Sequence, residues 1–458
     1  MSSPVLGPEL LVILAALTTM VIAATLISGV LRVLLIAQAL YWAMSYVARP
    51  VVLLSVHPEP RFGDNVADPR LADLGYDVAI GEVLRPVAFG LTVYAALMLV
   101  YVLWARTRPA PRFAALAGDP DLLWTLGVLY VLGTLARLAS VAVGAAGAAG
   151  EVESASPILS LLTMPATLGA VGAIVFLRAE ARTTAVLLGA VLLGELWWTT
   201  AIQSKTPVLG AALAIAVRFA LTGWSRAKLA GIGAVSVAGV AAFDWLQSLK
   251  STPYLRAQSA VIDSAYPDSV RPFLSLLRRF DLLEAATDAY YTGPSSWLSP
   301  GEVAGHLARS MIPSQLLAEE KLHSGTAWAN EVRGASVDMS QISVSLAEGN
   351  INEGYVVAGH TGIVVGVAFT AVVLVGWSRA LYSRHLTAVM FGVALIEVPV
   401  VFERGMLGSA ETLGKYLQVV VLAWLTNLVV VQWRRYREKT TTTAGPPAPA
   451  VVGSRGNQ

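Results

Sequence analysis

The sequence predicts an all-α polytopic membrane protein with about eleven transmembrane helices and a large, partly helical extracytoplasmic loop. Hydrophobic residues make up 55% of the 458 residues, charged residues make up 14%, and the mean hydropathy is +0.64. Soluble domains carry about a quarter charged residues, so this deficit indicates lipid as the solvent. The formal net charge is only +2, which provides no general attraction for nucleic acid.

Long apolar segments locate the expected transmembrane helices, because about 20 mostly apolar residues are needed to cross the hydrocarbon core. The first two segments meet at Gly29, and the seventh is short and rich in alanine. The expected helices are Leu10–Ser28, Leu31–Leu53, Pro86–Trp104, Leu122–Ala145, Ile158–Leu177, Thr184–Thr200, Val208–Leu221, Leu229–Leu246, Val357–Trp377, Leu386–Phe402 and Leu413–Trp433.

Basic residues fall in alternate loops between these segments, as the positive-inside rule requires. The short loop at residues 150–156 carries Glu151 and Glu153 and belongs to the opposite set. We therefore expect the N-terminus outside and the C-terminus in the cytoplasm. The basic residues of the loops assigned to the cytoplasm are Arg32, Arg106, Arg108, Arg112, Arg178, Arg182, Arg226, Lys228, Arg379, Arg384, Arg434, Arg435, Arg437 and Lys439.

This topology divides the chain into four parts. Residues 1–249 hold the first eight expected helices, 250–356 form the large outer loop, 357–433 hold the last three helices, and 434–458 form a disordered cytoplasmic tail. A shorter outer loop covers Ser55–Leu84. In the large loop, apolar residues recur at helical spacing in Val270–Tyr290, and Gly301–Ile312 is typical of a second short helix that Pro313 ends.

Several classes of site are excluded by composition and spacing. The chain has no cysteine, which excludes disulfides and thiolate chemistry. No pair of its five histidines has metal-ligand spacing, and no nucleotide-binding motif suits an outer face, so we expect neither metal nor cofactor. His323 and His360 lie in the outer region and are candidate acid–base groups, although a lone histidine is more often only hydrogen-bonded.

Charged side chains inside apolar segments are the next candidates, because they are costly in lipid and face a cavity or a partner. Arg137 and Glu195 lie in the outer halves of their segments, Lys205 follows in an outer turn, and Arg404 ends the tenth segment. These residues can surround one outward-facing cavity and bind an anionic substrate. Alternatively, Arg137 and Glu195 form a structural ion pair.

The large loop carries basic residues that suit a phosphate ligand. Arginine forks bind phosphate oxygens through paired hydrogen bonds, so an outer arginine cluster above the lipid fits a lipid-linked diphosphate. The strongest pair is Arg278 and Arg279, beside Asp281, and Arg271 and Lys321 belong to the same set. A solvated amphipathic face is the alternative for each of them.

The stretch Ser343–Gly366 is polar at first, then rich in small residues, and runs directly into the ninth expected helix. Small residues allow close backbone approach or helix packing. Glu353 stands where the loop meets the membrane, where it can hold a sugar hydroxyl or an arginine. The alternative is a polar cap on a re-entrant segment.

Several short segments carry a family resemblance when they are taken in chain order. They are Ser204-Lys205-Thr206-Pro207, Arg279-Phe280-Asp281, the helix from Gly301 to Ile312-Pro313 with the later Lys321, Ser324-Gly325-Thr326-Ala327, Ala347–Gly366, and Glu403-Arg404-Gly405. In this order and topology, the chain resembles the Wzy-type oligosaccharide repeat-unit polymerases of O-antigen and exopolysaccharide synthesis. It departs from that family at Val357-Ala358-Gly359, where Asn-Phe-Gly is frequent, and at Pro313-Ser314, where Pro-Arg is frequent.

The resemblance implies glycosyl transfer between polyprenyl-diphosphate-linked oligosaccharides on the outer leaflet of a bacterial inner membrane. The implied partners are this lipid-linked substrate, the bilayer, a chain-length regulator and a flippase. The implied roles are diphosphate binding by Arg279, Arg271 and Lys321, support of Arg278 or Arg279 by Asp281, a cavity wall from Arg137, Lys205 and Arg404, and orientation or deprotonation of the acceptor by Glu353 or His360.

Three alternatives stay open from the sequence. A flippase or transporter of lipid-linked sugars would carry internal repeats and helices broken near the midplane. An O-antigen-type ligase would differ in its acceptor rather than in its fold. A lipid-dependent glycosyltransferase with a monosaccharide donor would place acidic residues in its first outer loop, where this chain has Asp64, Asp68 and Asp73.

Overall fold

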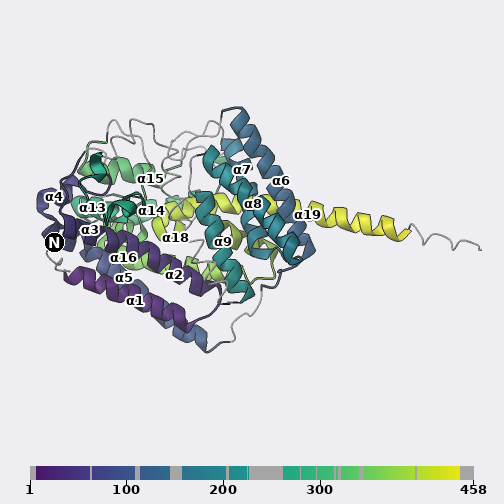
Figure 1. The fold of residues 1–458 in the computed structure, drawn as a ribbon, viewed down its shortest axis with the longest axis horizontal. Helices are drawn as coiled ribbons and strands as arrows, with labels where there is room; N and C mark the ends of the chain where they lie inside the picture. The colour runs from purple at the N-terminus through teal and green to yellow at the C-terminus, as the bar shows by residue number, and fades with distance from the viewer. Residues whose placement is uncertain are drawn as a thin grey trace, which may run out of the picture.

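The computed structural model describes residues 7–61, 64–108, 114–144, 157–202, 206–223, 225, 261–278, 280–294, 297–313, 316–317, 321–339, 345–397 and 400–443. Every regular element within these residues is a helix, which confirms the all-α prediction. Long helices form the body of the molecule, the short helices α4 and α13 lie near its N-terminus, and α19 projects from the far side (Figure 1).

The helices fall into two groups along the chain. The first group is α1 (Pro8–Leu26), α2 (Val30–Ala43), the π-helical η1 (Met44–Ala48), α3 (Arg49–Val56), α4 (Pro69–Leu74), α5 (Tyr76–Arg106), α6 (Pro120–Ala142), α7 (Pro157–Phe176), α8 (Ala181–Ala201) and α9 (Thr206–Thr222). The second is η2 (Arg271–Phe273), α12 (Leu274–Leu277), α13 (Leu282–Thr292), α14 (Pro300–Ser310), α15 (Ser324–Ala327), η4 (Trp328–Val332), η5 (Arg333–Ala335), α16 (Asn350–Ala380), α17 (Leu386–Glu397), α18 (Val400–Glu403) and α19 (Met406–Thr443).

Within the described residues, seven helical segments are long and apolar enough to cross a membrane. They are Pro8–Leu26, Val30–Val56, Tyr76–Arg106, Pro120–Ala142, Arg182–Ala201, Asn350–Ala380 and Met406–Lys439. Three shorter apolar helices, Leu161–Phe176, Gly210–Thr222 and Leu386–Ile396, coincide with the predicted fifth, seventh and tenth spans. The predicted eighth span, Leu229–Leu246, lies outside the described residues. A helical membrane protein is thus supported, whereas the number eleven stays a prediction.

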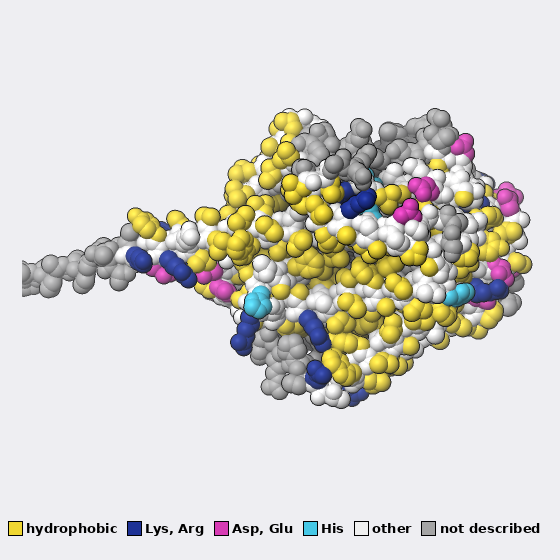
Figure 2. Space-filling view, turned by 180° about the vertical axis from the view of Figure 1, so that it is seen from behind, with side chains coloured by type: hydrophobic (Ala, Val, Ile, Leu, Met, Phe, Trp, Pro, Cys, Tyr) yellow, Lys and Arg dark blue, Asp and Glu magenta, His cyan; other side chains and the backbone are white. Residues whose placement is uncertain are grey.

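The outer surface of the bundle is apolar, as a lipid solvent requires. Val100 is 66% exposed, Leu193 68% and Val372 72%, each on a different long helix. Hydrophobic side chains cover most of the central band of the face seen in Figure 2. In water such a surface would be an aggregation site, so these helices pack against lipid.

Contacts between distant segments show which helix ends lie together. The Val30 N–H donates to the Tyr382 hydroxyl at 3.1 Å, and Arg379 lies over the ring of Trp104 at 5.9 Å. Arg434 pairs with Asp121. These contacts join the start of α2 and the end of α5 to the end of α16, and the start of α6 to the last third of α19. The predicted order of spans requires the same grouping.

At the other end of the helices, the two long loops meet and are joined by buried charged side chains. We call this group the loop cluster; it consists of Arg49, Asp68, Arg70, Glu284, Asp288 and Arg333. Asp288 is fully buried and pairs with Arg70 at 2.8 Å and with Arg333 at 3.0 Å. Three cations face three carboxylates, so each buried charge is compensated. The cluster fastens α13 to the first loop.

Several predicted boundaries are wrong. Gly75, with φ of 80°, ends α4, and helix α5 starts at the next residue, Tyr76. The first outer loop is therefore shorter than the predicted Ser55–Leu84. The predicted helix over Val270–Tyr290 is divided into α12 and α13. Helix α19 continues to Thr443, where we expected tail from residue 434. The second loop helix is confirmed as α14, Pro300–Ser310.

The ninth predicted span is a hairpin at its start. Within α16, Ala358 (φ −152°, ψ 30°) and Gly359 (φ 57°, ψ −140°) leave the helical conformation. A Cβ on Gly354 would collide with the carbonyl of Gly362, and one on Gly366 would lie 2.6 Å from the carbonyl oxygen of Asn350. Residues 350–357 and 360–380 are therefore antiparallel arms in backbone contact. This matches the re-entrant alternative that the sequence left open.

We predict that Gly362→Ala destabilises the fold, because its added methyl group has no space between the two arms. Overpacking of this kind costs about 1–3 kcal/mol, and thermal unfolding in detergent, followed by size-exclusion chromatography, measures it. Gly376→Ala is the matched control, since no atom lies within 4 Å of its added Cβ. Equal melting temperatures of the two variants would contradict the hairpin packing.

Candidate functional site

Helix α14 is built to begin sharply on the surface of the large loop. The Ser299 hydroxyl accepts from the Glu302 N–H at 3.3 Å, and the Glu302 carboxylate accepts from the Ser299 N–H at 2.8 Å, which forms a capping box. Pro300 takes the first helical position, where no N–H is needed. The helix therefore keeps its shape although it is only 11 residues long.

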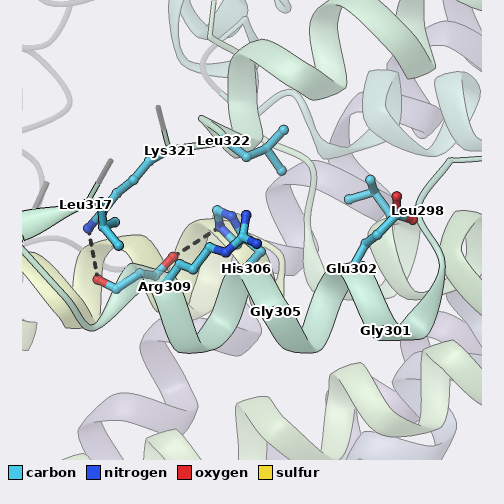
Figure 3. Close-up of a pocket in the computed structure, with 10 residues that line it drawn as sticks. Leu298, Gly301, Glu302, Gly305, His306, Arg309, Leu317, Lys321 and Leu322 are labelled. Carbon is cyan, nitrogen blue, oxygen red and sulfur yellow. Dashed lines mark hydrogen bonds between the residues drawn. The ribbon is translucent and has the colours of Figure 1, made fainter. Parts of the chain in front are cut away.

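A groove of about 510 Å³ runs along this helix, and we call it the α14 groove. It is lined by Leu298, Gly301, Glu302, Gly305, His306, Arg309, Ser310, Leu317, Lys321 and Leu322. The glycines leave room above the helix, since no atom lies within 4 Å of a Cβ built on Gly305. Figure 3 shows His306 and Arg309 on the face of α14 that is turned toward Lys321 and Leu322.

Two cations line the α14 groove. Arg309 is exposed, and Lys321 is half-buried with its ammonium donating to the carbonyls of Ser310, at 3.4 Å, and of Ile312. Burial and the nearby charge of Lys415 lower the pKa of Lys321. A bound anion would relieve that repulsion, and the third N–H of the ammonium can donate to it. The groove therefore has two cations to bind an anion, with one carboxylate, Glu302, in the same lining.

The floor of the α14 groove rests on α19. Gly414 of α19 lies against the Ser310 carbonyl, so closely that a Cβ there would collide with it. Next to this contact, His306 Nε2 lies 3.3 Å from Glu411 Oε1 and 3.2 Å from the Ser310 hydroxyl. Glu411 also accepts from the Ser324 N–H at 2.7 Å. One carboxylate of α19 thus joins α14 to α15.

Polar contacts continue from Glu411 into the bundle. A Cβ on Gly408 would lie 2.9 Å from the Ser324 hydroxyl and 2.7 Å from the Glu348 carboxylate, so these groups meet at one turn of α19. Glu348 is fully buried and pairs with Arg404 at 3.3 Å. Arg404 also donates to the Leu346 carbonyl at 3.0 Å. The α14 groove is therefore the outer end of a polar path that reaches a buried ion pair.

The structure brings two of the predicted site residues together at the start of α19. Glu353 is fully buried, and its carboxylate accepts from the Met406 N–H at 2.7 Å and from the Leu407 N–H at 3.3 Å. A carboxylate at a helix N-terminus satisfies free N–H groups and complements the helix dipole. Arg404 lies two residues before Met406. Glu353 thus caps α19 from the hairpin, outside the α14 groove.

The predicted arginines of the large loop are placed elsewhere. Arg271 pairs with Asp268 at 2.6 Å and donates to the Tyr266 carbonyl at 2.8 Å. Arg278 pairs with Asp263 at 2.6 Å and approaches Asp64 at 3.8 Å. These contacts hold the turn before α12 against the first loop.

The other residues predicted for the diphosphate site are placed as follows. Asp281 directly precedes α13. The carboxylates that pair with Arg278 belong to Asp263 and Asp64. Arg279 lies outside the described residues, as does Lys205. Among the described cations that we predicted for a diphosphate, Lys321 is the one that lines the α14 groove.

Arg137 and His360 lie apart from the α14 groove. Arg137 is buried, pairs with Glu195 at 2.6 Å, and lies 4.9 Å from the centre of the Trp198 ring. This geometry is the structural ion pair that the sequence left open. His360 is exposed at the turn of the hairpin, with its ring 5.0 Å from that of Phe89.

Sequence reasoning missed the contact between His306 and Glu411. The two residues are 105 positions apart in sequence, and each looks like an ordinary polar residue of an amphipathic helix. The loop cluster was missed for the same reason. The one local signal was the short helix Gly301–Ile312 ended by Pro313, which located α14 but not the helix beneath it.

Comparisons with known proteins add no assignment. No protein-family model, no curated protein and no solved structure matches the chain. Within the described residues, no group of three or more His, Asp or Glu side chains is arranged to hold a metal ion. The geometry of the α14 groove is therefore the basis for a functional proposal.

We predict that Arg404→Met makes stability depend more strongly on pH. Burial raises the pKa of Glu348, and the charge of Arg404 opposes that rise. The folded state thus binds a proton at Glu348 more tightly than the unfolded state, so stability falls as the pH rises from the unfolded toward the folded pKa. Without Arg404 the folded pKa rises further, and the loss of melting temperature between pH 5 and pH 8 grows.

The control for this experiment is Arg85→Met, which removes an exposed arginine that pairs with Glu82 on the surface of α5. Exposed pairs contribute about 0–1 kcal/mol, so this variant should keep the pH dependence of the wild type. If the melting temperatures of Arg404→Met and the wild type change with pH in parallel, Arg404 does not lower the pKa of Glu348.

Proposed function

We propose that the chain is a membrane glycosyltransferase that polymerises polyprenyl-diphosphate-linked oligosaccharide repeat units, and that the α14 groove receives the diphosphate. The observation that carries this proposal is the pair of cations, Arg309 and Lys321, in an open groove at one end of an apolar bundle. A diphosphate needs such cations, because charge-assisted hydrogen bonds are the strongest that proteins offer it. The sequence resemblance described above supports the same substrate class.

The surroundings of the α14 groove suit a ligand with a lipid tail. Leu298, Leu317 and Leu322 line it, and beyond the end of α14 Ile312 is 40% exposed and Leu316 75% exposed. Apolar side chains beside an anion site fit an amphiphile better than they fit a free sugar phosphate. The prenyl chain would then leave the groove over this apolar edge toward the bilayer.

Polymer growth at this position needs little chemistry from the protein. An acceptor sugar hydroxyl attacks the anomeric carbon of the donor, and the bond from that carbon to the lipid diphosphate breaks with its electron pair on the diphosphate. Cations that touch the diphosphate stabilise the charge that develops on it. Arg309 and Lys321 are assigned this role, and the bilayer holds both lipid-linked substrates near the groove.

The proposed orientation places the α14 groove on the extracytoplasmic side of a bacterial inner membrane. Basic residues at the opposite end support it, since positive charge in short loops marks the cytoplasmic side. Those within the described residues are Arg32, Arg106, Arg108, Arg178, Arg182, Arg379, Arg384, Arg434, Arg435, Arg437 and Lys439.

The first test is polymerisation by the purified protein in vesicles that contain prenyl-diphosphate-linked repeat units. We predict polymer formation by the wild type and a loss of kcat/KM of about 10- to 100-fold for Arg309→Ala and for Lys321→Ala, because each removes a charged hydrogen bond of about 1.5–3 kcal/mol. Arg85→Ala is the control. Full activity of both groove variants would show that the diphosphate does not bind in this groove.

A second test fills the α14 groove instead of removing its charge. We predict that Gly305→Leu abolishes turnover, because its side chain enters the open space above α14 without meeting the rest of the fold. Gly376→Leu introduces the same side chain at an exposed helical glycine far along α16 and should keep wild-type turnover. Turnover by both variants at the wild-type rate would mean that the groove is not the substrate site.

A transporter of lipid-linked sugars is the second candidate, and the hairpin of α16 favours it, because broken helices are typical of transporter binding sites. Vesicles that contain a labelled prenyl-diphosphate sugar separate the two functions. Transfer of the label across the bilayer without polymer would support transport, and polymer without transfer would support the glycosyltransferase.

A further inference from the structure

The arrangement around His306 differs from that of the other titratable groups near the α14 groove. His306 lines the groove, while its Nε2 lies within hydrogen-bond distance of Glu411 and Ser310. No hydrogen bond to its Nδ1 is recorded among the described residues. A carboxylate that binds one ring nitrogen fixes the orientation of an imidazole and stabilises its protonated form. The second nitrogen is then the one that can take a proton.

Other candidate bases near the groove are occupied. Glu302 accepts from the Ser299 N–H and hydroxyl in the capping box. Glu348 and Glu353 are fully buried, the first against Arg404 and the second at the start of α19. Among these groups, His306 is the one that combines a fixed orientation with a place in the groove wall.

We propose that His306 is the general base of the glycosyl transfer and that Glu411 is its positioning residue. This inference rests on the proposed function. The acceptor hydroxyl gives its proton to Nδ1 of His306 while its oxygen forms the bond to the anomeric carbon. The lipid diphosphate leaves with the electron pair of the broken bond. The proton then passes from the imidazolium to water or to the departing diphosphate, which regenerates the neutral base.

Charged groups surround this imidazole from three directions. Its own helix α14 contributes Arg309 and Glu302, and the segment that faces α14 contributes Lys321. Helix α19 contributes Glu411 in contact and Lys415 one turn further, and Glu348 acts on Glu411 from the hairpin side. Glu411 is the carboxylate in contact with the ring, so it is the group that fixes the orientation of the imidazole.

The test is the pH profile of polymerisation in vesicles. In the wild type, kcat should rise with pH through an inflection of the kind that an imidazole gives. His306→Gln should lose about 100-fold or more in kcat, together with that inflection, while KM for the lipid-linked donor changes little. His385→Gln replaces an exposed histidine at the other end of the bundle and should match the wild type.

Two further variants separate catalysis from structure. Glu411→Gln should lower kcat with little change in KM, because an amide holds the imidazole in its orientation less firmly than a carboxylate does. His306→Ala leaves space in the groove wall, and added imidazole should restore part of its kcat, which a merely misfolded variant would not show.

The outcomes are distinguishable. If the wild type makes no polymer from the lipid-linked donor, the proposed function fails, and the base assignment fails with it. If the wild type makes polymer but His306→Gln keeps its kcat and its inflection, the base assignment alone is overturned. Absence of imidazole rescue in a correctly folded His306→Ala would also overturn it.

Discussion

The cap that Glu353 forms on α19 is the contact on which the rest of the structure depends. The carboxylate stands on the short arm of the hairpin and accepts two N–H groups at the start of α19. It can reach them only because Gly354 and Gly362 let the two arms touch. Helix α19 in turn carries Gly414 and Glu411 to α14. The shape of the α14 groove therefore depends on a contact deep within the bundle.

Burial explains why a carboxylate makes that cap. Glu353 is fully buried, and a buried polar group is tolerable only with hydrogen-bond partners. The free N–H groups at a helix start provide both hydrogen bonds and a favourable dipole. A few residues away, Glu348 is balanced by Arg404 instead. Two acids of the segment that precedes and begins α16 are thus satisfied in different ways, one by a helix start and one by an arginine.

The sequence predicted the elements whose signals are local. Apolar length located the spans, and the helical stretch Gly301–Ile312 with Pro313 at its end located α14. Buried charge in apolar helices identified Arg137 and Glu195, which do pair. Contacts between distant segments that carry no charge inside an apolar helix could not be predicted in this way. His306 and Glu411 meet because α14 lies on α19, and Arg70 reaches Asp288 because the two loops meet. The sequence around these residues indicates neither contact.

The arginines predicted for a diphosphate illustrate the same limit. Residue type alone does not distinguish an arginine that binds a ligand from one that binds an acid of the fold. Arg271 and Arg278 have such acids nearby in Asp268 and Asp263. In a loop domain without disulfides, ion pairs of this kind hold turns in place. Lys321, by contrast, lines the α14 groove and donates to backbone carbonyls rather than to an acid of the fold.

Helix α19 extends from the wall of the groove to the opposite end of the bundle and beyond. Its 38 residues give a length of about 57 Å at about 1.5 Å per residue. Glu411 stands in its second turn, while Arg434 stands near the far end beside Asp121. A continuous helix of this length moves largely as one rigid rod. A tilt of α19 that is small near Asp121 would therefore displace Glu411 relative to His306.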